Sequence, residues 1–163
     1  MLPTTESKIM QCTIVNMSKT SKMPCHSYSL PAQSCKTGSK LAKIVGSVCH
    51  GCYALKGIYR MPTVQAPRQA NLESLPSEGL SRGWVAWADT MAIQIAKVEK
   101  SGFYRWHDSG DLQGRMHFAA IVRIANALPD IRFWLPTKEK AIVAEYLRLG
   151  HSLPDNLIVR VSS

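Results

Sequence analysis

Three cysteines in the first third of the chain have a spacing that suits metal ligation. Cys49 and Cys52 form a C-x2-C turn, in which two thiolates can reach one metal from a tight bend that Gly51 permits. Cys35 lies upstream in a Cys35-x13-Cys49 spacing, between lysines and a glycine that favour a thiolate and let backbone N–H groups approach it. We expect Cys35, Cys49 and Cys52 to bind a metal or a metal cluster together.

This spacing favours an iron–sulfur cluster over zinc. Structural zinc sites close four ligands, usually with a second C-x2-C or a paired His motif, and this chain has a single C-x2-C. A 4Fe-4S or 3Fe-4S cluster tolerates irregular spacing and takes thiolate ligands. Zinc, and burial of the thiols without any metal, remain alternatives. Cys25 or His26 is a possible fourth ligand, whereas Cys12 lies in a predicted short strand and is expected to be buried.

The cysteine count and the N-terminus together indicate a reducing compartment. Five cysteines are an odd number, and residues 1–8 lack the basic start and apolar core of a secretory signal. We therefore expect the protein in the cytoplasm, where disulfides are rare. Its apolar runs stop well short of the roughly 18 residues of a membrane-spanning helix, so no membrane partner is expected.

The positive charge of the chain is concentrated in its cysteine-containing part. Residues 1–70 hold nine Lys or Arg against one acid, Glu6, whereas residues 71–163 hold eleven bases and ten acids. A local positive field attracts nucleic-acid phosphates or an anionic substrate, although scattered lysines also keep a loop-rich surface in solution. A host protein is another possible partner, but such a contact leaves no mark in a sequence. The candidate phosphate contacts are Lys36, Lys40, Lys43, Lys56, Arg60 and Arg68.

The second part of the chain predicts an α/β fold within a single domain of 163 residues. Residues 1–62 show little periodicity and are expected to form an irregular, basic, metal-binding segment, with the α/β core in residues 63–163. Trp84 and Trp87 belong to an apolar stripe that predicts a buried helix over residues 79–100. Strand–helix–strand units of the observed length form a small parallel sheet, here resembling part of a barrel. The other expected elements are helices over 64–75, beginning near Pro67, over 114–128 and over 138–149, and strands over 103–107, 131–135 and 157–161.

Polar residues follow the predicted strands at their carboxyl ends, where the sites of parallel α/β sheets form. His107, Asp108 and Asp111 are therefore the candidate catalytic residues, acting as general acids or bases or as metal ligands. The alternative is structural, because an acid in this turn can cap the next helix and His107 can be an interior residue. Three strand ends are expected to converge on one edge of the sheet: residues 107–111, 136–138 and 162–163.

Residues 30–38, 46–59, 106–111 and 134–138 carry a resemblance to a known family. Their C-x2-C-Tyr-Ala and His-Asp-Ser-Gly-Asp motifs are fairly specific, and the chain from residue 19 onward resembles the bacteriophage gene-eighty-eight protein family. The resemblance implies a phage protein in the cytoplasm of an infected bacterial cell. It also implies that the three cysteines and the turn at residues 107–111 belong to one site.

A more distant similarity is to the radical S-adenosylmethionine enzymes, in which three cysteines hold an iron–sulfur cube at the mouth of a partial α/β barrel. Tyr53 and the turn at residues 109–111 are loose counterparts, whereas the Cys35-x13-Cys49 spacing departs from the C-x3-C-x2-C of that family. Two hypotheses follow. The first is an iron–sulfur protein with a redox role or cluster-dependent catalysis. The second is a nucleic-acid-binding module stapled by zinc or an iron–sulfur cluster.

Overall fold

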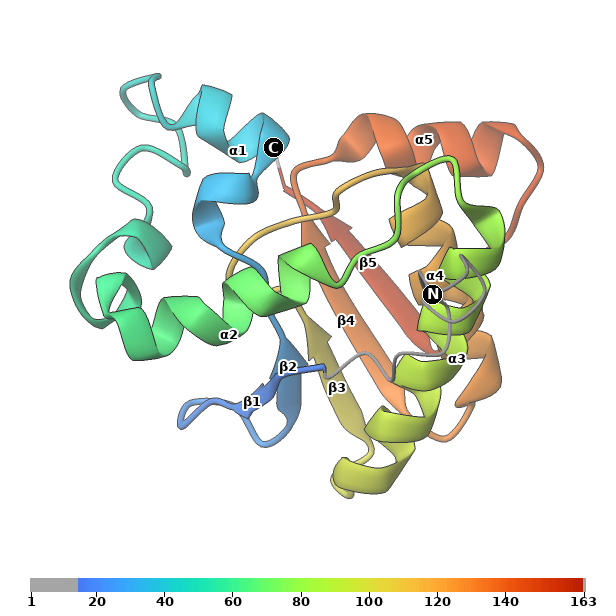
Figure 1. The fold of residues 1–163 in the computed structure, drawn as a ribbon. Helices are drawn as coiled ribbons and strands as arrows, with labels where there is room; N and C mark the ends of the chain where they lie inside the picture. Colours follow the sequence, from blue (N-terminus) through green and yellow to red (C-terminus); the bar gives the residue numbers. More distant parts are fainter. Residues whose placement is uncertain (1–14, 163) are drawn as a thin grey trace, which may run out of the picture.

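The fold is built on one five-stranded sheet, seen in a computed structural model that describes residues 15–162 (Figure 1). The strands lie in chain order, and β1 is antiparallel to β2 while the other three pairings are parallel. The α/β class and the last three strands were predicted from the sequence and are confirmed. The strand bounds are β1 Met17–Lys19, β2 His26–Tyr28, β3 Phe103–Trp106, β4 Arg132–Thr137 and β5 Leu157–Val161.

Three helices in the second half of the chain follow the predicted apolar periodicities closely. They are α3, Ser81–Val98, α4, Arg115–Ala127, and α5, Lys140–Arg148. A further helix, α2, spans Pro62–Glu73 and so begins earlier than the predicted start near Pro67. Pro62 takes the first-turn position in which a proline is tolerated, and Pro67 lies inside the helix, so the prediction for this helix start was wrong.

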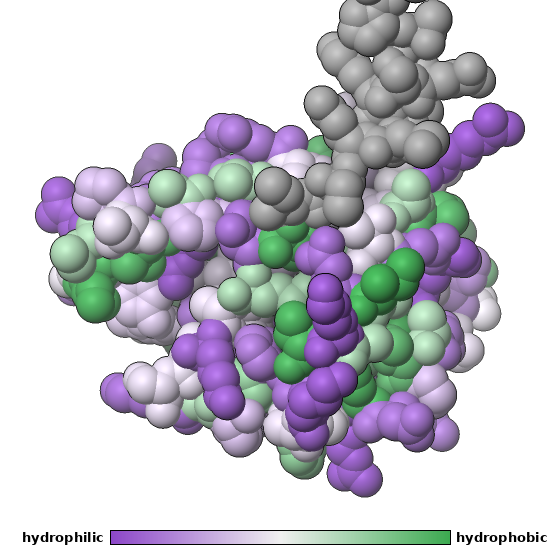
Figure 2. Space-filling model, turned by 60° about the horizontal axis from the view of Figure 1, so that its bottom comes forward, coloured by the Kyte–Doolittle hydropathy of each residue, from purple (hydrophilic) through white to green (hydrophobic). Residues whose placement is uncertain are grey.

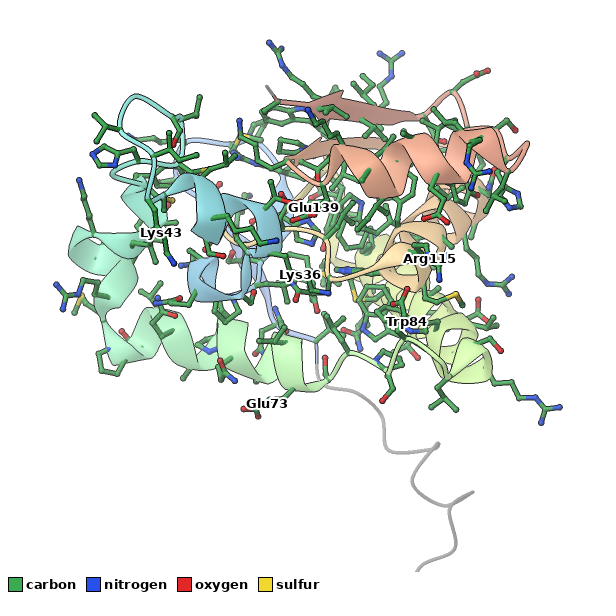
Figure 3. All side chains as sticks on the ribbon, turned by 90° about the horizontal axis from the view of Figure 1, so that it is seen from above. Lys36, Lys43, Glu73, Trp84, Arg115 and Glu139 are labelled. Atoms are coloured by element: carbon green, nitrogen blue, oxygen red, sulfur yellow. The ribbon has the colours of Figure 1, made fainter. Side chains whose placement is uncertain are left out.

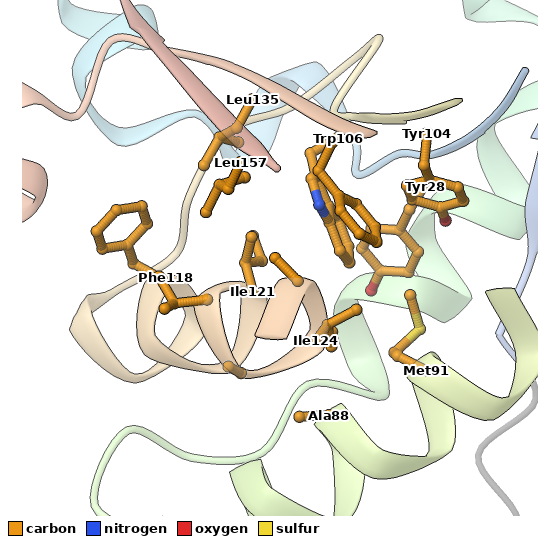
Figure 4. Close-up of a cluster of buried hydrophobic side chains, with 14 of the residues drawn as sticks. Tyr28, Ala88, Met91, Tyr104, Trp106, Phe118, Ile121, Ile124, Leu135 and Leu157 are labelled. Carbon is orange, nitrogen blue, oxygen red and sulfur yellow. The ribbon is translucent and has the colours of Figure 1, made fainter. Parts of the chain in front are cut away.

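The hydrophobic core lies between the sheet and its helices. Side chains from β3, β4 and β5 that point to one face, such as Tyr104, Trp106 and Leu135, are fully buried against α3 and α4 (Figure 4). Trp84 and Trp87 are each 3% exposed and belong to this core, as the apolar stripe predicted. Burial of each large side chain contributes about 1.5–3 kcal/mol, so this core stabilises the sheet that carries the candidate site.

The opposite face of the sheet is open. Helices α3, α4 and α5 lie on one side of the strands (Figure 3), and residues that alternate with the core residues are exposed or half-buried. Phe103 and Ile158 are 49% and 59% exposed, and Arg105 stacks on the half-buried Trp134 with its guanidinium carbon 4.8 Å from the ring centroid. The open face therefore carries both aromatic and cationic side chains.

The segment before α2 is less irregular than the sequence indicated. Two three-residue strands, β1 and β2, lie within it, and β2 pairs with β3 at the centre of the fold. These strands escaped prediction because MSK and HSY are short and polar, with no apolar alternation to mark them. Cys12 and its predicted strand lie outside the described residues. The remaining short elements are η1 Ala32–Ser34, α1 Lys36–Leu41, η2 Tyr53–Leu55 and η3 Gly57–Arg60.

None of the helices within residues 15–162 is long and apolar enough to cross a membrane. In the view of Figure 2, hydrophilic residues separate the hydrophobic ones into small areas. The predicted site residues of the chain are instead gathered at the carboxyl edge of the sheet, where the segment before α2 passes over the strand ends.

Candidate functional site

The three parallel strand ends and the cysteine-bearing segment meet at one cavity of about 180 Å³, which we call the cysteine cavity. Turns after β3, β4 and β5 line one side of it, and the chain around α1 and η2 lines the other. The structure therefore brings the predicted cysteines and the predicted strand-end residues into one place. The polar residues around the cavity are Cys35, Cys49, Cys52, Tyr53, Arg105, His107, Asp108, Ser109, Asp111, Thr137, Lys138 and Ser162.

The three cysteines reach this cavity from two local structures, the start of α1 and the C-x2-C turn before η2. Cys35 precedes α1, Cys52 precedes η2, and the Cys52 amide donates to the Cys49 carbonyl at 3.2 Å across the C-x2-C turn. Gly51 supplies the left-handed conformation of that turn, with φ 75°. A Cβ atom at Gly38 would stand 3.6 Å from the Cys49 Sγ and 3.7 Å from the Cys35 Sγ, so the absent side chain leaves room between two thiols.

The thiols are not packed around a point. Among residues 15–162, no group of three or more His, Cys, Asp or Glu side chains is arranged to hold one metal ion. A tetrahedral zinc site needs every donor about 2.0–2.3 Å from the ion, so a zinc ion would have to draw the thiols closer together than they stand in the structure. The four described cysteines are free thiols. The cavity thus offers three thiols around a space rather than a closed single-ion site.

Burial governs the protonation of these thiols. It raises the pKa of Cys35 to about 12, and the nearby Asp111, Cys52, Cys49 and Glu139 act in the same direction. The pKa of Cys49 is also raised by burial, although Lys138 opposes the shift. These shifts run against the expectation that flanking lysines favour a Cys35 thiolate. Lys36 instead turns away to donate from its ammonium group to the carbonyl of Gln113.

Asp111 joins two strand ends. One of its carboxylate oxygens accepts from the Leu112 amide at 2.7 Å and from the Thr137 hydroxyl, and the other accepts from the Lys138 amide at 2.7 Å. Burial still raises the pKa of Asp111 above its usual value, against these hydrogen bonds. It does not cap α4, whose N-cap is Gly114 with no side-chain cap. Both oxygens are engaged, so Asp111 positions the β3 and β4 ends relative to each other.

Asp108 has one oxygen without a partner. The side chain is buried, with Oδ2 3.6 Å from an Arg68 nitrogen, and Oδ1 has no hydrogen-bond partner within residues 15–162. Burial raises the pKa of Asp108, and the charges of Arg68 and Arg105, together with the backbone N–H groups of Ser109 and of Asp108 itself, offset that shift only in part. Its carbonyl accepts a hydrogen bond from the Tyr53 hydroxyl. Among the three predicted catalytic residues, Asp108 therefore has the carboxyl group most available for proton transfer.

His107 turns the chain from β3 into the site. Its backbone has φ 55°, which is uncommon for a residue other than glycine, and its amide donates to the Tyr28 carbonyl at 2.8 Å. The side chain is 4% exposed, and neither ring nitrogen has a partner within the described part of the chain. Burial, assisted by the Arg105 charge, lowers the pKa of His107 to about 3. Its imidazole is therefore neutral at pH 7.

The strand-end turn is locked to the cysteine-bearing segment by contacts that sequence reasoning missed. A Cβ atom at Gly110, which has φ 80°, would lie 2.6 Å from the Leu30 Cβ, so only glycine fits this crossing. Glu139 accepts from the Thr37 amide at 2.8 Å and from the Thr37 hydroxyl at 2.9 Å, at the start of α5 beside α1 (Figure 3). These bonds hold the segment that carries Cys35 against the β4 end.

A buried pair of histidines was also missed. His117 on α4 is fully buried, and its ring centroid lies 5.3 Å from that of His107 in an edge-to-face arrangement. The Gln113 amide donates to His117 Nδ1 at 3.2 Å, while Nε2 has no partner within residues 15–162. Burial lowers the pKa of His117 well below its usual value. In the sequence, His117 is a single histidine on an apolar helix face. Nothing in that pattern indicated that its ring would pack against His107.

Two predicted residues lie elsewhere. Cys25 is 2% exposed and stands just before β2, at the amino edge of the sheet, so it does not line the cysteine cavity with the other thiols. Arg68 is only 8% exposed and lies over the Tyr59 ring while it faces Asp108. Its prediction as a surface phosphate contact was wrong, because packing on an aromatic ring and ion pairing hold it inside. The remaining predicted contacts are exposed: Lys36, Lys40, Lys43, Lys56 and Arg60.

The fold and the site define a class: a small, mainly parallel α/β protein with three thiols at the carboxyl edge of its sheet. Over residues 5–163 the chain matches the family described as Gene product 88, and it belongs to this bacteriophage family. Neither the curated proteins nor the solved structures gave a match. The similarity to radical S-adenosylmethionine enzymes stays a prediction.

Proposed function

We propose that the chain is an iron–sulfur protein in the cytoplasm of an infected bacterial cell, with Cys35, Cys49 and Cys52 as cluster ligands. The observation that carries the proposal is their convergence on one cavity, although Cys35 precedes α1 and the other two lie in the C-x2-C turn before η2. Thiolates are the normal ligands of such clusters, and a cube needs ligands spread more widely than a single ion does. When bound, the cluster supplies electron transfer or an open iron for a substrate.

The protein residues beside the thiols have distinct parts in this proposal. Gly38 leaves the space between two sulfurs, and Asp111 fixes the strand ends that form the floor of the cavity. Asp108 can hold or release a proton at Oδ1, which lacks a partner in the described structure. His107 offers a neutral imidazole whose nitrogens have no partner among residues 15–162. These groups favour redox chemistry or cluster-dependent catalysis over simple structural stapling.

The test is iron and acid-labile sulfide analysis, with a visible absorption spectrum, on protein purified without oxygen. We expect three or four irons with matching sulfide, as a 3Fe-4S or 4Fe-4S cluster requires. Cys49→Ser should lose the cluster, whereas Cys25→Ser, at the other edge of the sheet, should keep it. Colourless wild-type protein with neither iron nor sulfide contradicts the proposal, and so does equal iron in the two variants.

The second candidate function is a metal-stapled nucleic-acid-binding module. The observation that favours it is a run of exposed bases, including Lys40, Lys43 and Arg60, in a stretch that has no acid between Glu6 and Glu73. Phosphate contacts of this kind make binding fall steeply with salt. A colourless protein with one zinc, together with DNA or RNA binding that weakens in Lys40→Gln and Lys43→Gln, is the outcome that selects this function over the first.

A further inference from the structure

A second cavity adjoins the cysteine cavity on the side of the β1–β2 loop. This side cavity encloses about 620 Å³, and its walls come from that loop, from the chain around η2 and η3, and from the end of β3. Tyr53, Arg105 and Asp108 line both cavities. Small-molecule sites commonly have volumes of this order. The side cavity is thus large enough for a compact organic ligand placed next to the thiols.

One wall of the side cavity is aromatic. The rings of Tyr53 and Tyr59 meet edge to face, with centroids 5.4 Å apart. Tyr53 is 57% exposed, so part of its ring is open to a ligand. Tyrosine rings stack with other flat rings, including nucleobases, without reading their sequence. This wall therefore suits a ligand with a planar ring.

A second wall is cationic. Arg105 is held by its stacking on Trp134, and its guanidinium forms no ion pair with a carboxylate within residues 15–162. Its Nε is buried without a hydrogen-bond partner. Lys22 adds an exposed ammonium group from the β1–β2 loop. A pre-oriented guanidinium and an ammonium group that line one cavity can together receive a phosphate.

The third feature is a buried acceptor. Asp108 is 6% exposed, and its Oδ1 has no partner in the described residues, although Oδ2 faces Arg68. The Thr20 hydroxyl, on the β1–β2 loop, is another lining group that is buried without a partner within residues 15–162. A carboxylate oxygen in this setting suits a ligand hydroxyl, as acidic residues bind ribose in dinucleotide sites. A ligand that carries a planar ring, an anionic group and a hydroxyl group would therefore match all three features of the side cavity.

We propose that the side cavity binds a nucleotide. Its phosphate lies between Arg105 and Lys22, and its base lies against Tyr53 and Tyr59. A ribose hydroxyl donates to Asp108. Binding does not depend on the cluster, but the role of the nucleotide as a substrate beside the thiols rests on the proposed iron–sulfur function.

Calorimetric titration of the full chain tests the binding, with adenosine monophosphate, adenosine and inorganic phosphate as probes. We expect saturable binding of one adenosine monophosphate per chain. Adenosine and phosphate should each bind at least about tenfold more weakly, because each lacks one group that the cavity recognises. Phosphate that binds as tightly as the nucleotide overturns the proposal, and so does an absence of saturable nucleotide binding at millimolar concentration.

Charge variants separate recognition from general effects on the fold. Arg105→Gln and Lys22→Gln should each weaken adenosine monophosphate binding by about tenfold while leaving adenosine binding unchanged. Lys22 lies on an exposed loop, so its variant stays informative even if Arg105→Gln unfolds. Arg160→Gln, an exposed arginine on β5 outside both cavities, is the matched control and should bind all probes as the wild type does. Unchanged nucleotide affinity in Lys22→Gln and in a folded Arg105→Gln contradicts the site.

The cluster-free Cys49→Ser variant distinguishes the two proposals. Nucleotide binding that persists in this variant supports the side cavity as an independent site. Wild-type protein that carries iron and sulfide but binds no nucleotide overturns the side cavity alone. Nucleotide binding by wild-type protein that was purified without oxygen and holds neither iron nor sulfide overturns the cluster alone and leaves the cavity as a binding site.

Discussion

The two sides of the strand ends are held together by different forces. Below them, α3 and α4 bury large apolar side chains such as Trp106 and Phe118 against the sheet. Above them, the cysteine-bearing segment exposes Val45, Val48 and Ile58 and is fastened by a few polar contacts such as Thr37 to Glu139. Hydrophobic burial is thus concentrated between the sheet and helices α3 and α4, which together we call the platform, whereas the layer that carries the thiols depends on specific polar contacts.

The largest effect should come from emptying the core of the platform. Trp106 is fully buried and its ring packs against Tyr28, Tyr104 and Phe133. Trp106→Ala should lower the free energy of unfolding by about 3–5 kcal/mol, because a large cavity replaces the ring. Urea unfolding followed by far-ultraviolet circular dichroism measures it. A loss below about 1 kcal/mol would show that the platform is not the main source of stability.

Acid should destabilise the platform next most strongly, through the paired histidines. His107 and His117 stay neutral when folded, with pKa values pushed below 6.5 by burial, but both become charged in the unfolded chain. The unfolded state therefore binds more protons below pH 6.5, and folding stability falls as the pH drops. His107 should contribute up to about 1.4 kcal/mol per pH unit between pH 6 and 4, and His117 should add to the loss of stability in the same direction.

Urea titrations of the cluster-free Cys49→Ser chain at several pH values measure this slope without interference from metal release. His117→Gln in the same background should reduce the slope by the contribution of one histidine. A slope that His117→Gln leaves unchanged would assign the acid sensitivity to other groups.

A smaller and more local effect should follow from Glu139→Gln. The carboxylate of Glu139 accepts two hydrogen bonds from Thr37, and charge-assisted bonds of this kind contribute about 1.5–3 kcal/mol. Loss of the charge should loosen α1 without unfolding the sheet. Limited proteolysis should therefore cut faster near α1, and iron retention should fall. Glu145→Gln, whose carboxylate makes an exposed ion pair, is the control and should change neither.

Gly38→Ala should change the stability least of these variants and should nevertheless lower the iron content of the site. A Cβ atom there stands 3.1 Å from the Cys35 Cβ and close to two thiol sulfurs. Alanine is a better helix former than glycine, so the free energy of unfolding should shift by less than about 1 kcal/mol. Iron content should nevertheless drop. Gly79→Ala meets nothing within 4 Å and should leave iron content unchanged; equal iron in both variants would remove Gly38 from the site.

The sequence predicted the platform better than the layer above it, for a physical reason. Helices such as α3 and strands such as β5 bury one face. Their apolar residues therefore recur at a helix or strand spacing that is visible in the sequence. The polar strand β2 is stabilised by its neighbours, so its own residues carry little signal. For the site, the C-x2-C spacing and the polar strand ends marked residues that do line one cavity.

What the sequence did not reveal were the long-range partners of those residues. Arg68 is predicted at the surface from its charge alone, and only the fold shows that Tyr59 and Asp108 enclose it. The role of Glu139 likewise comes from Thr37, which lies 102 positions away in the chain. The role of His117 comes from its contact with His107 at the end of β3. Local patterns do not encode such contacts, because they depend on which elements the fold brings together.

The open face of the sheet also gives the protein an optical reporter. Of its four tryptophans, Trp84, Trp87 and Trp106 are at most 3% exposed, while Trp134 is half-buried beneath Arg105. A polar quencher such as acrylamide should therefore reach Trp134 first and leave most of the emission intact. Any molecule that settles against Arg105 will shield this one indole, so its quenching reads out occupancy of the open face without a label.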